Sequence, residues 1–410
     1  MAEVNTSCNI FEHKKKNNEA NGYTDELAEK FASEAGIEAR PKETVKEIDE
    51  RGAFIRQPNA FITKFGDKEG ELKAYGDKRY KIYWARLCHW SNRPVIARDI
   101  LGLHDVIADE VVSGTGESNI YGWGFPTYKD YKDPDTGAHF LSELYKNGNK
   151  DFQGRATTPA FVDLKDKKTV NNDYHRLTNY LEVQFRALQP KDAPDLYPKK
   201  YRKEIDEFND WLFPHINNSH YRMSFCTSIE AYEEAYNDFF ESLDKLEKRL
   251  SENRFIFGDY ITDADIRLYP TLERWETYYY HNVGPMKKRL SEYKNIWGYI
   301  KELYNIPEFK RYTYFGEDYG RRDKRSFIYR LSVQYDYDKL WATDGERKKL
   351  SQDPDHIYLR HPKGESVEDY QTEISDSIWN SPSWEDRNPK NGVISVDASI
   401  NPLKGLLKNE

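Results

Sequence analysis

Apolar and polar positions follow different patterns in the two halves of the chain. Between about residue 78 and residue 185, short apolar runs alternate with helical segments, as in 80–85 followed by 92–101. In residues 228–252 the apolar positions recur at spacings of three and four, which is typical of an amphipathic helix. The pattern predicts an α/β half followed by an all-helical half.

The segments between these patterns divide the chain into four predicted parts. Residues 1–55 are charged with one short helical pattern, which predicts an N-terminal arm. Residues 56–188 form the predicted α/β domain, in which 113–150 is a predicted long loop and a helix is predicted from about residue 172 toward Phe185. A proline-rich linker from 189 to 198 opens a helical domain, 189–320. After residue 320 the composition shifts toward Arg, Lys, Asp and Tyr, so 321–410 is predicted to be a C-terminal extension.

One cysteine, Cys88, lies between a predicted strand and a predicted helix. Free N–H groups and the helix dipole favour an anion there, and the thiolate is the nucleophilic form of cysteine. Thr158-Pro159 follows seventy residues later and opens another apolar run. This is the layout of a thioredoxin-like domain, in which the proline is cis and the residue before it pairs through its backbone with a bound thiol peptide.

Composition limits the class of protein. The 62 basic and 70 acidic residues give a net charge of −8, which does not favour nucleic-acid binding. Mean hydropathy is −0.93, and no apolar run reaches the ~18 residues of a membrane span. The start of the chain lacks the pattern of a signal peptide, and three scattered cysteines (Cys8, Cys88, Cys226) fit a reducing cytoplasm. Ten histidines show no metal-ligand spacing, so we predict no metal.

Several short motifs occur together between about residues 56 and 314. They include Leu87-Cys-His-Trp-Ser-Asn-Arg93, Gly122-Trp-Gly-Phe125, Gly154-Arg-Ala-Thr-Thr-Pro159 and Thr262-Asp-Ala-Asp265. In the last of these, Thr262 and Asp265 are predicted to form a capping box at the start of a helix. Together they resemble the xi class of glutathione transferases, the glutathionyl-hydroquinone reductases. The resemblance implies a glutathione transferase fold, with an N-terminal thioredoxin-like domain and a C-terminal helical bundle domain, and a homodimer.

The resemblance also implies an activity: thiol-dependent reduction of S-conjugated hydroquinones. The Cys88 thiolate attacks the sulfur of the conjugate, the aryl carbon leaves and is protonated, and Cys88 keeps the thiol as a mixed disulfide. A second thiol molecule then releases Cys88, because Ser91 cannot resolve the disulfide as a second cysteine would. The implied co-substrate is glutathione or a related low-molecular-weight thiol, and no tightly bound cofactor is expected.

The family's thiol-binding residues match four positions of this chain. Trp123 is expected to cover the thiol, Arg155 to pair with a carboxylate, and the Thr158 backbone to pair with the thiol peptide. Asp173 is expected to accept an ammonium group. For Trp123 and Arg155, the alternatives are packing and a surface ion pair.

Tyr221 and Tyr279 match family tyrosines that line the pocket for the aromatic ring. A phenol can hydrogen-bond a hydroquinone oxygen and can donate a proton to the leaving carbon. Both tyrosines are therefore candidate acids, with helix–helix packing as the alternative for each.

Four positions depart from the family motifs. His89 replaces a proline, and is either a packing residue or a cation that stabilises the thiolate. Ser91 replaces an alanine and is expected to form hydrogen bonds within the helical turn. Asp173-Tyr174 replaces Glu-Ser, and the Tyr174 phenol cannot donate from the position of a short serine hydroxyl, which leaves the identity of the thiol open.

Two other functions remain consistent with the sequence. A general thioltransferase would use the same cysteine on mixed disulfides, and would prefer a simple mixed disulfide to an aryl thioether. A non-catalytic transferase-fold protein that binds an aromatic ligand or a partner would fit the substitutions at His89 and Tyr174, but it has no need of a thiolate at Cys88.

Overall fold

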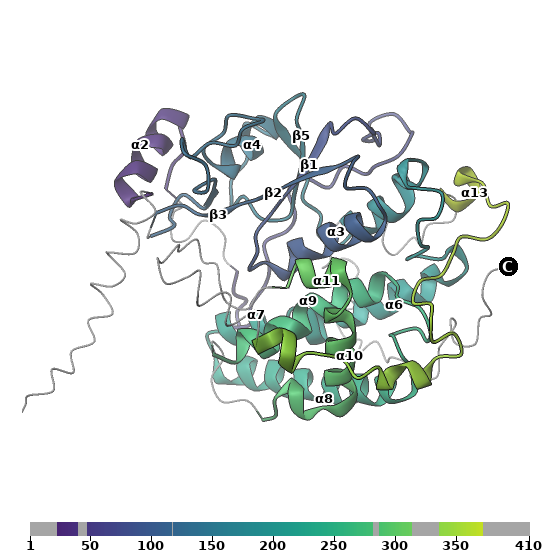
Figure 1. Cartoon of the computed structure of the whole chain (residues 1–410). Coiled ribbons are helices and arrows are strands. Elements are labelled where there is room, and N and C mark those ends of the chain that lie inside the picture. The colour runs from purple at the N-terminus through teal and green to yellow at the C-terminus, as the bar shows by residue number, and fades with distance from the viewer. Residues whose placement is uncertain (1–22, 40–46, 117, 282–286, 314–335, 372–410) are drawn as a thin grey trace, which may run out of the picture.

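A four-stranded mixed sheet forms the centre of the first half of the chain (Figure 1). The computed structural model describes residues 23–39, 47–116, 118–281, 287–313 and 336–371. The strand order is β2-β1-β5-β6. Strand β1 is parallel to β2 and antiparallel to β5, and β5 is antiparallel to β6. The strands are β1 (Tyr80–Trp84), β2 (Ala108–Val111), β5 (Ala160–Asp163) and β6 (Lys168–Asn171), with a separate pair of β3 (Ser113–Gly114) and β4 (Trp123–Gly124).

Strand β1 is buried on both faces, because its side chains alternate between two apolar clusters. Tyr80, Ile82 and Trp84 belong to the large cluster that continues into the helical half. Tyr83 faces the smaller cluster, which also contains Cys88. The sheet therefore joins the main core to the surroundings of the predicted nucleophile.

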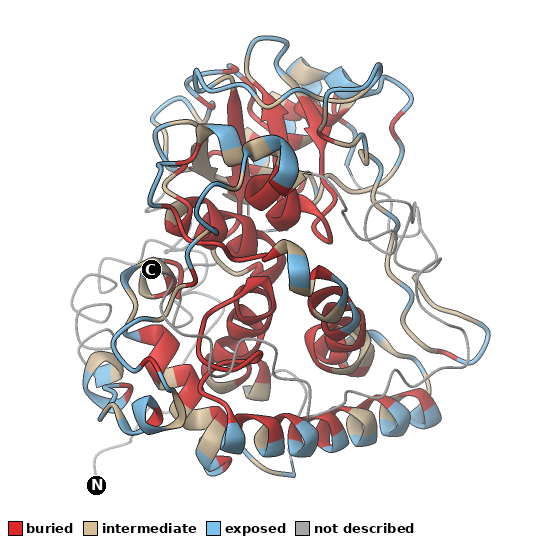
Figure 2. Cartoon of the chain, turned by 90° about the vertical axis from the view of Figure 1, so that its right-hand side faces the viewer, coloured by how far each residue is buried: buried red, intermediate tan, exposed pale blue. Residues whose placement is uncertain are grey.

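Helices make up most of the second half, below the sheet in Figure 1. In chain order the α-helices are α2 (Asp25–Ala35), α3 (His89–Ile100), α4 (Leu141–Gly148), α5 (Leu177–Asn179), α6 (Arg202–Leu212), α7 (Ser219–Phe225), α8 (Ile229–Glu252), α9 (Asp263–Thr277), α10 (Lys294–Tyr304), α11 (Pro307–Arg311) and α13 (Val367–Gln371). The long helix α8 buries one face and exposes the other (Figure 2), as its spacing predicts. No helix in the described segments is long and apolar enough to cross a membrane.

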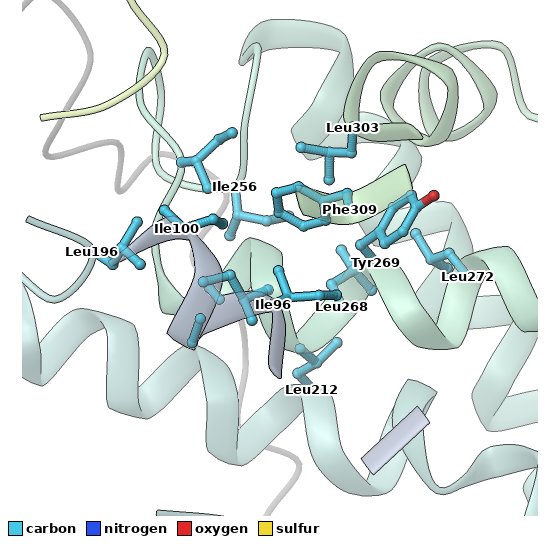
Figure 3. Packing of buried hydrophobic residues seen from close by; sticks show 14 of the residues in the cluster. Ile96, Ile100, Leu196, Leu212, Ile256, Leu268, Tyr269, Leu272, Leu303 and Phe309 are labelled. Atoms are coloured by element: carbon cyan, nitrogen blue, oxygen red, sulfur yellow. The ribbon is translucent and has the colours of Figure 1, made fainter. Parts of the chain in front are cut away.

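Helices α3 and α9 hold the two halves together. Ile96 and Ile100 of α3 share the main core with Leu268 and Leu272 of α9, and Figure 3 shows Ile96 beside Leu268. All four side chains are at most 9% exposed. Because α3 begins directly after Cys88, this packing fixes the position of Cys88 relative to the helical half.

The predicted capping box begins helix α9. The Asp265 carboxylate accepts a hydrogen bond from the Thr262 backbone N–H at 2.8 Å. It also accepts the Ile256 N–H at 3.0 Å and the Tyr299 hydroxyl at 2.9 Å. Burial raises the pKa of Asp265 to about 6, although these bonds oppose the shift. The cap therefore also links α9 to α10.

Three segments differ from the sequence predictions. The segment 113–150, predicted as a long loop, contains β3, β4 and helix α4. The helix expected to run toward Phe185 is short, because α5 gives way to a π-helical turn at Tyr180–Gln184. The part of the C-terminal extension from 336 to 371 packs onto the helical half, where Trp341 and Tyr370 join the main core. The domain limits at 55, 188 and 320 stay predictions.

Candidate active site

Cys88 lies at the amino end of helix α3, as predicted. It has extended backbone angles, and its carbonyl accepts the N–H groups of Ser91 at 3.0 Å and Asn92 at 3.1 Å. Its Sγ lies 3.5 Å from the carbonyl oxygen of Thr158, and the Thr158-Pro159 peptide bond is cis, as expected. The side chain is 8% exposed. The structure thus brings the candidate nucleophile to the backbone predicted to hold a thiol peptide.

Ser91 fixes the turn that carries the cysteine. Its Oγ lies 2.9 Å from the Cys88 carbonyl oxygen and 3.1 Å from that of Ala85, and it accepts the Ala85 N–H at 3.2 Å. This is the hydrogen-bonding role expected from the sequence. The side chain is completely buried.

Of the two roles expected for His89, the structure favours the packing residue over the cation beside Cys88. Its ring is completely buried, and Nδ1 lies 2.8 Å from the Thr271 hydroxyl of α9. Burial lowers the pKa of His89 well below its usual value, and the neighbouring guanidinium groups of Arg93 and Arg56 lower it further.

Arginines supply the positive charge near Cys88. Arg93 is buried with its guanidinium 4.6 Å from the centre of the Trp90 ring, and burial lowers its pKa only to about 9. Arg274 of α9 donates to the Leu87 carbonyl at 2.9 Å. Arg56 comes from the segment before β1. Burial lowers its pKa, but Tyr174, Tyr221 and Cys88 together raise it above its usual value. Arginine side chains are cationic at neutral pH.

The two candidate acids meet on the helical side of the site. Tyr221 of α7 stacks on the His89 ring at 5.7 Å, and Tyr279 meets the same ring edge-on at 5.9 Å between ring centres. His220 stacks on Tyr279 at 3.8 Å. Burial raises the pKa of Tyr279 well above 10, and its hydroxyl has no hydrogen-bond partner among the described residues. Tyr279 is therefore a protonated phenol with its hydrogen available.

The predicted thiol-binding residues lie around the same site, but two of them already contact other parts of the chain. Arg155 Nη2 lies 2.5 Å from the Glu47 carboxylate, in the segment that leads into the sheet. Asp173 pairs with Arg176 at 3.3 Å and accepts the Asn59 side-chain amide at 3.1 Å. Trp123, on β4, packs against the cluster that contains Cys88.

Tyr174 is buried at the junction of the two halves. Its ring packs on Trp90 at 5.1 Å and on Phe213 at 6.2 Å between ring centres. Its hydroxyl accepts a hydrogen bond from Arg56 Nε at 3.1 Å.

The sequence analysis did not identify Arg56 as a site residue. Arg56 stands outside every motif quoted above, and only the path of residues 47–61 brings it to the site.

Comparison with known proteins places the chain in a family. The model of the glutathione S-transferase C-terminal domain matches residues 229–302. Glutathionyl-hydroquinone reductase YqjG of Escherichia coli K12 is 36% identical over 231 residues, which cover 56% of this chain and 70% of that protein. The chain belongs to the glutathionyl-hydroquinone reductase family.

Solved structures of this reductase family confirm the fold. The xi glutathione transferase of Phanerochaete chrysosporium superposes with a TM-score of 0.62 at 31% identity, covering 68% of this chain and 90% of that one. The glutathione-bound structure of YqjG gives a TM-score of 0.55 at 33% identity, covering 62% and 85%. The predicted glutathione transferase fold, with a thioredoxin-like and a helical part, is therefore correct.

A cavity of about 200 Å³ lies beside the segments that carry Trp123 and Arg155. Its lining includes Gly122, which precedes Trp123, and Gly154 and Ala156, which flank Arg155. Lys146 and Lys150 contribute two cations. Among the described residues, no group of three or more His, Cys, Asp or Glu side chains is placed to hold a metal ion.

Proposed function

We propose that this protein reduces S-glutathionyl hydroquinones with glutathione, through a mixed disulfide at Cys88. The observation that carries the proposal is the Cys88 thiol at the start of α3, 3.5 Å from the Thr158 carbonyl and beside two buried tyrosines. Its relative YqjG is named a glutathionyl-hydroquinone reductase and binds glutathione in a solved structure.

In the first proposed step the Cys88 thiolate attacks the sulfur of the conjugate. A sulfur–sulfur bond forms, the aryl carbon–sulfur bond breaks, and the electron pair of that bond goes to the aryl carbon. Tyr279 donates a proton to this carbon and is reprotonated from solvent, while Tyr221 hydrogen-bonds a ring oxygen. The products are the free hydroquinone and Cys88 carrying a glutathionyl group.

In the second step a glutathione thiolate attacks the mixed disulfide. This attack forms oxidised glutathione and returns Cys88 as a thiolate. An external thiol is needed because Ser91, and not a second cysteine, stands in the turn after Cys88. Overall, two thiols are oxidised to a disulfide and the aryl carbon is reduced by two electrons. No resident cofactor takes part.

In the proposed thiol-binding site, Trp123 covers the thiol and the Thr158 backbone pairs with the peptide. Arg155 binds a carboxylate, and Asp173 binds the ammonium group. Arg155 pairs with a carboxylate in the structure, that of Glu47, and Asp173 already accepts a donor from Asn59. These contacts support the proposal, because a guanidinium that pairs with one carboxylate can pair with another, and a carboxylate that accepts an N–H donor can accept an ammonium. Glutathione binding therefore includes an exchange of these contacts for those of the peptide.

We further propose a homodimer in the cytoplasm, as expected from the sequence. Its domains are the thiol-binding residues 56–188 and the helical residues 189–320.

The proposed activity is tested by supplying one S-glutathionyl hydroquinone and one simple glutathionyl mixed disulfide in separate assays with excess glutathione. Faster turnover of the aryl thioether supports the reductase. A clear preference for the mixed disulfide supports the thioltransferase alternative, and binding without turnover of either supports a non-catalytic role.

A further inference from the structure

Arg56 is enclosed by aromatic rings beside the nucleophile. Its guanidinium carbon lies 4.7 Å from the centre of the Tyr221 ring, 4.8 Å from that of Trp90 and 5.5 Å from that of Tyr174. A cation over aromatic faces is stabilised by their quadrupoles. This packing fixes the cation at the junction of the two halves.

Two hydrogen bonds set the orientation of the guanidinium. Arg56 Nε donates to the Tyr174 hydroxyl at 3.1 Å, and Nη1 donates to the Asn218 side-chain oxygen at 3.3 Å. Both acceptors are neutral. Within the described ranges, no carboxylate pairs with Arg56 and its Nη2 makes no hydrogen bond. The site therefore holds a half-buried cation with donor capacity left for an anion.

The position of this cation complements the neighbouring acid. Asp173 directly precedes Tyr174, and its carboxylate is the group expected to accept an ammonium. Arg56 is held by the hydroxyl of the next side chain. An α-amino acid carries an ammonium and a carboxylate on one carbon. The Asp173 carboxylate and the Arg56 guanidinium held beside it by Tyr174 match these two charges.

We propose that Arg56, held by Tyr174, binds the α-carboxylate at the γ-glutamyl end of the co-substrate thiol. The inference rests on the proposed use of a glutathione-like thiol. It assigns to a guanidinium the contact that a short serine hydroxyl makes in the family pattern, and it explains how a tyrosine can stand in that place. The site then selects thiols that bear an amino-acid head group over simple thiols.

The test measures equilibrium binding without turnover, by calorimetry on full-length protein carrying Cys88→Ser. The two probes are glutathione and its analogue 4-aminobutyryl-cysteinyl-glycine, which keeps the amine and lacks the α-carboxylate. A hydrogen-bonded ion pair predicts that the parent protein binds glutathione about 10- to 100-fold more tightly than the analogue. Arg56→Gln should remove that difference by weakening glutathione alone.

Arg51→Gln is the matched control. Arg51 lies in the same segment, but it is exposed and pairs with Asp49 and Glu234, so it should leave both affinities unchanged. Tyr174→Phe keeps the ring and removes only the hydroxyl that holds Arg56, so it should weaken glutathione several-fold and spare the analogue. Should Arg56→Gln fail to fold by circular dichroism, Tyr174→Phe decides alone.

Equal binding of the two probes by the parent protein overturns the inference, as does an equal loss for both probes in Arg56→Gln. Because no reductase chemistry enters the measurement, the proposed activity can fail separately. Selective glutathione binding that depends on Arg56, in a protein that does not turn over hydroquinone conjugates, would leave the inference standing and refute the proposed reaction.

Discussion

The imidazole Nδ1 of His89 lies 2.8 Å from the hydroxyl oxygen of Thr271, which links the residue after Cys88 to helix α9. The same hydroxyl oxygen accepts a hydrogen bond from Asn217 Nδ2 at 2.9 Å. All three side chains are at most 2% exposed. Thr271 therefore links the cysteine turn of the first half to two elements of the helical half.

Replacing Thr271 with valine should lower the free energy of unfolding by about 1–3 kcal/mol, because it leaves the buried Nδ1 of His89 without a partner. It also removes one of the two hydrogen bonds of Asn217 Nδ2, which keeps the one to the Arg267 carbonyl. Denaturant titration measures the change. Thr271→Ser keeps the hydroxyl, so its free energy of unfolding should fall clearly less than that of the valine variant. Equal losses in both variants would mean that the threonine methyl group, and not the hydrogen bonds, stabilises this contact.

His89 should not control the reactivity of Cys88 through its own titration, because burial keeps its ring neutral. The rate of Cys88 alkylation by iodoacetamide should therefore keep the same dependence on pH between 5.5 and 7.5 when His89 is changed to asparagine. Loss of a step near the usual pKa of histidine, about 6.5, would show that His89 does act as a cation.

Glu273 should make the folded state less stable as pH rises. Burial raises its pKa to about 8, from the usual 4.5 of a glutamic acid. Between these values the folded protein holds a proton that the unfolded chain has released, so this contribution to stability is complete below pH 4.5 and falls with rising pH, by about 1.4 kcal/mol per unit. The effect should disappear in Glu273→Gln.

The measurement for Glu273 is the free energy of unfolding at pH 5.5 and at pH 7.5. The advantage of Glu273→Gln over wild type should grow between the two values. Glu233→Gln, at an exposed position of α8, is the control and should show a constant difference. If the two variants behave alike, Glu273 is ionised in the folded protein.

The sequence allowed the sheet, the helical half and the cysteine turn to be predicted, since each depends on a local pattern. The strand 80–84, the helix after Cys88 and the capping box at Thr262 are set by neighbouring residues. The state of His89 could not be predicted in this way, because its burial depends on α9, 182 positions away. The same holds for Arg56, whose partner Tyr174 lies 118 positions along the chain.

Tyr279 should matter only where a carbon leaving group needs a proton. Tyr279→Phe keeps the ring that stacks on His220, so the fold should be retained. Reduction of an aryl thioether should fall by about 10²–10⁴-fold, the usual size of general acid catalysis. Reduction of a simple mixed disulfide should hardly change, because a thiolate leaves without protonation. Equal losses on both substrates would mean that Tyr279 supports the fold or thiol binding and is not the proton donor.

Cys88→Ala should lose nearly all reductase activity, and Cys226→Ser should keep most of it. Cys226 is half-buried on the carboxyl side of α7, where its thiol lies 3.3 Å from the Met223 carbonyl. Steady-state release of hydroquinone measures both variants. Substantial activity in Cys88→Ala would remove the cysteine from the mechanism.

The most direct test of the central claim is a single turnover without free thiol. Wild-type protein is mixed with one equivalent of an S-glutathionyl hydroquinone, and the intact mass, the modified peptide and the released quinol are measured together. The account predicts one glutathionyl group on Cys88 for each hydroquinone released, and its removal by added glutathione. Hydroquinone release with Cys88 unmodified, or a glutathionyl group on Cys226 in its place, would contradict it.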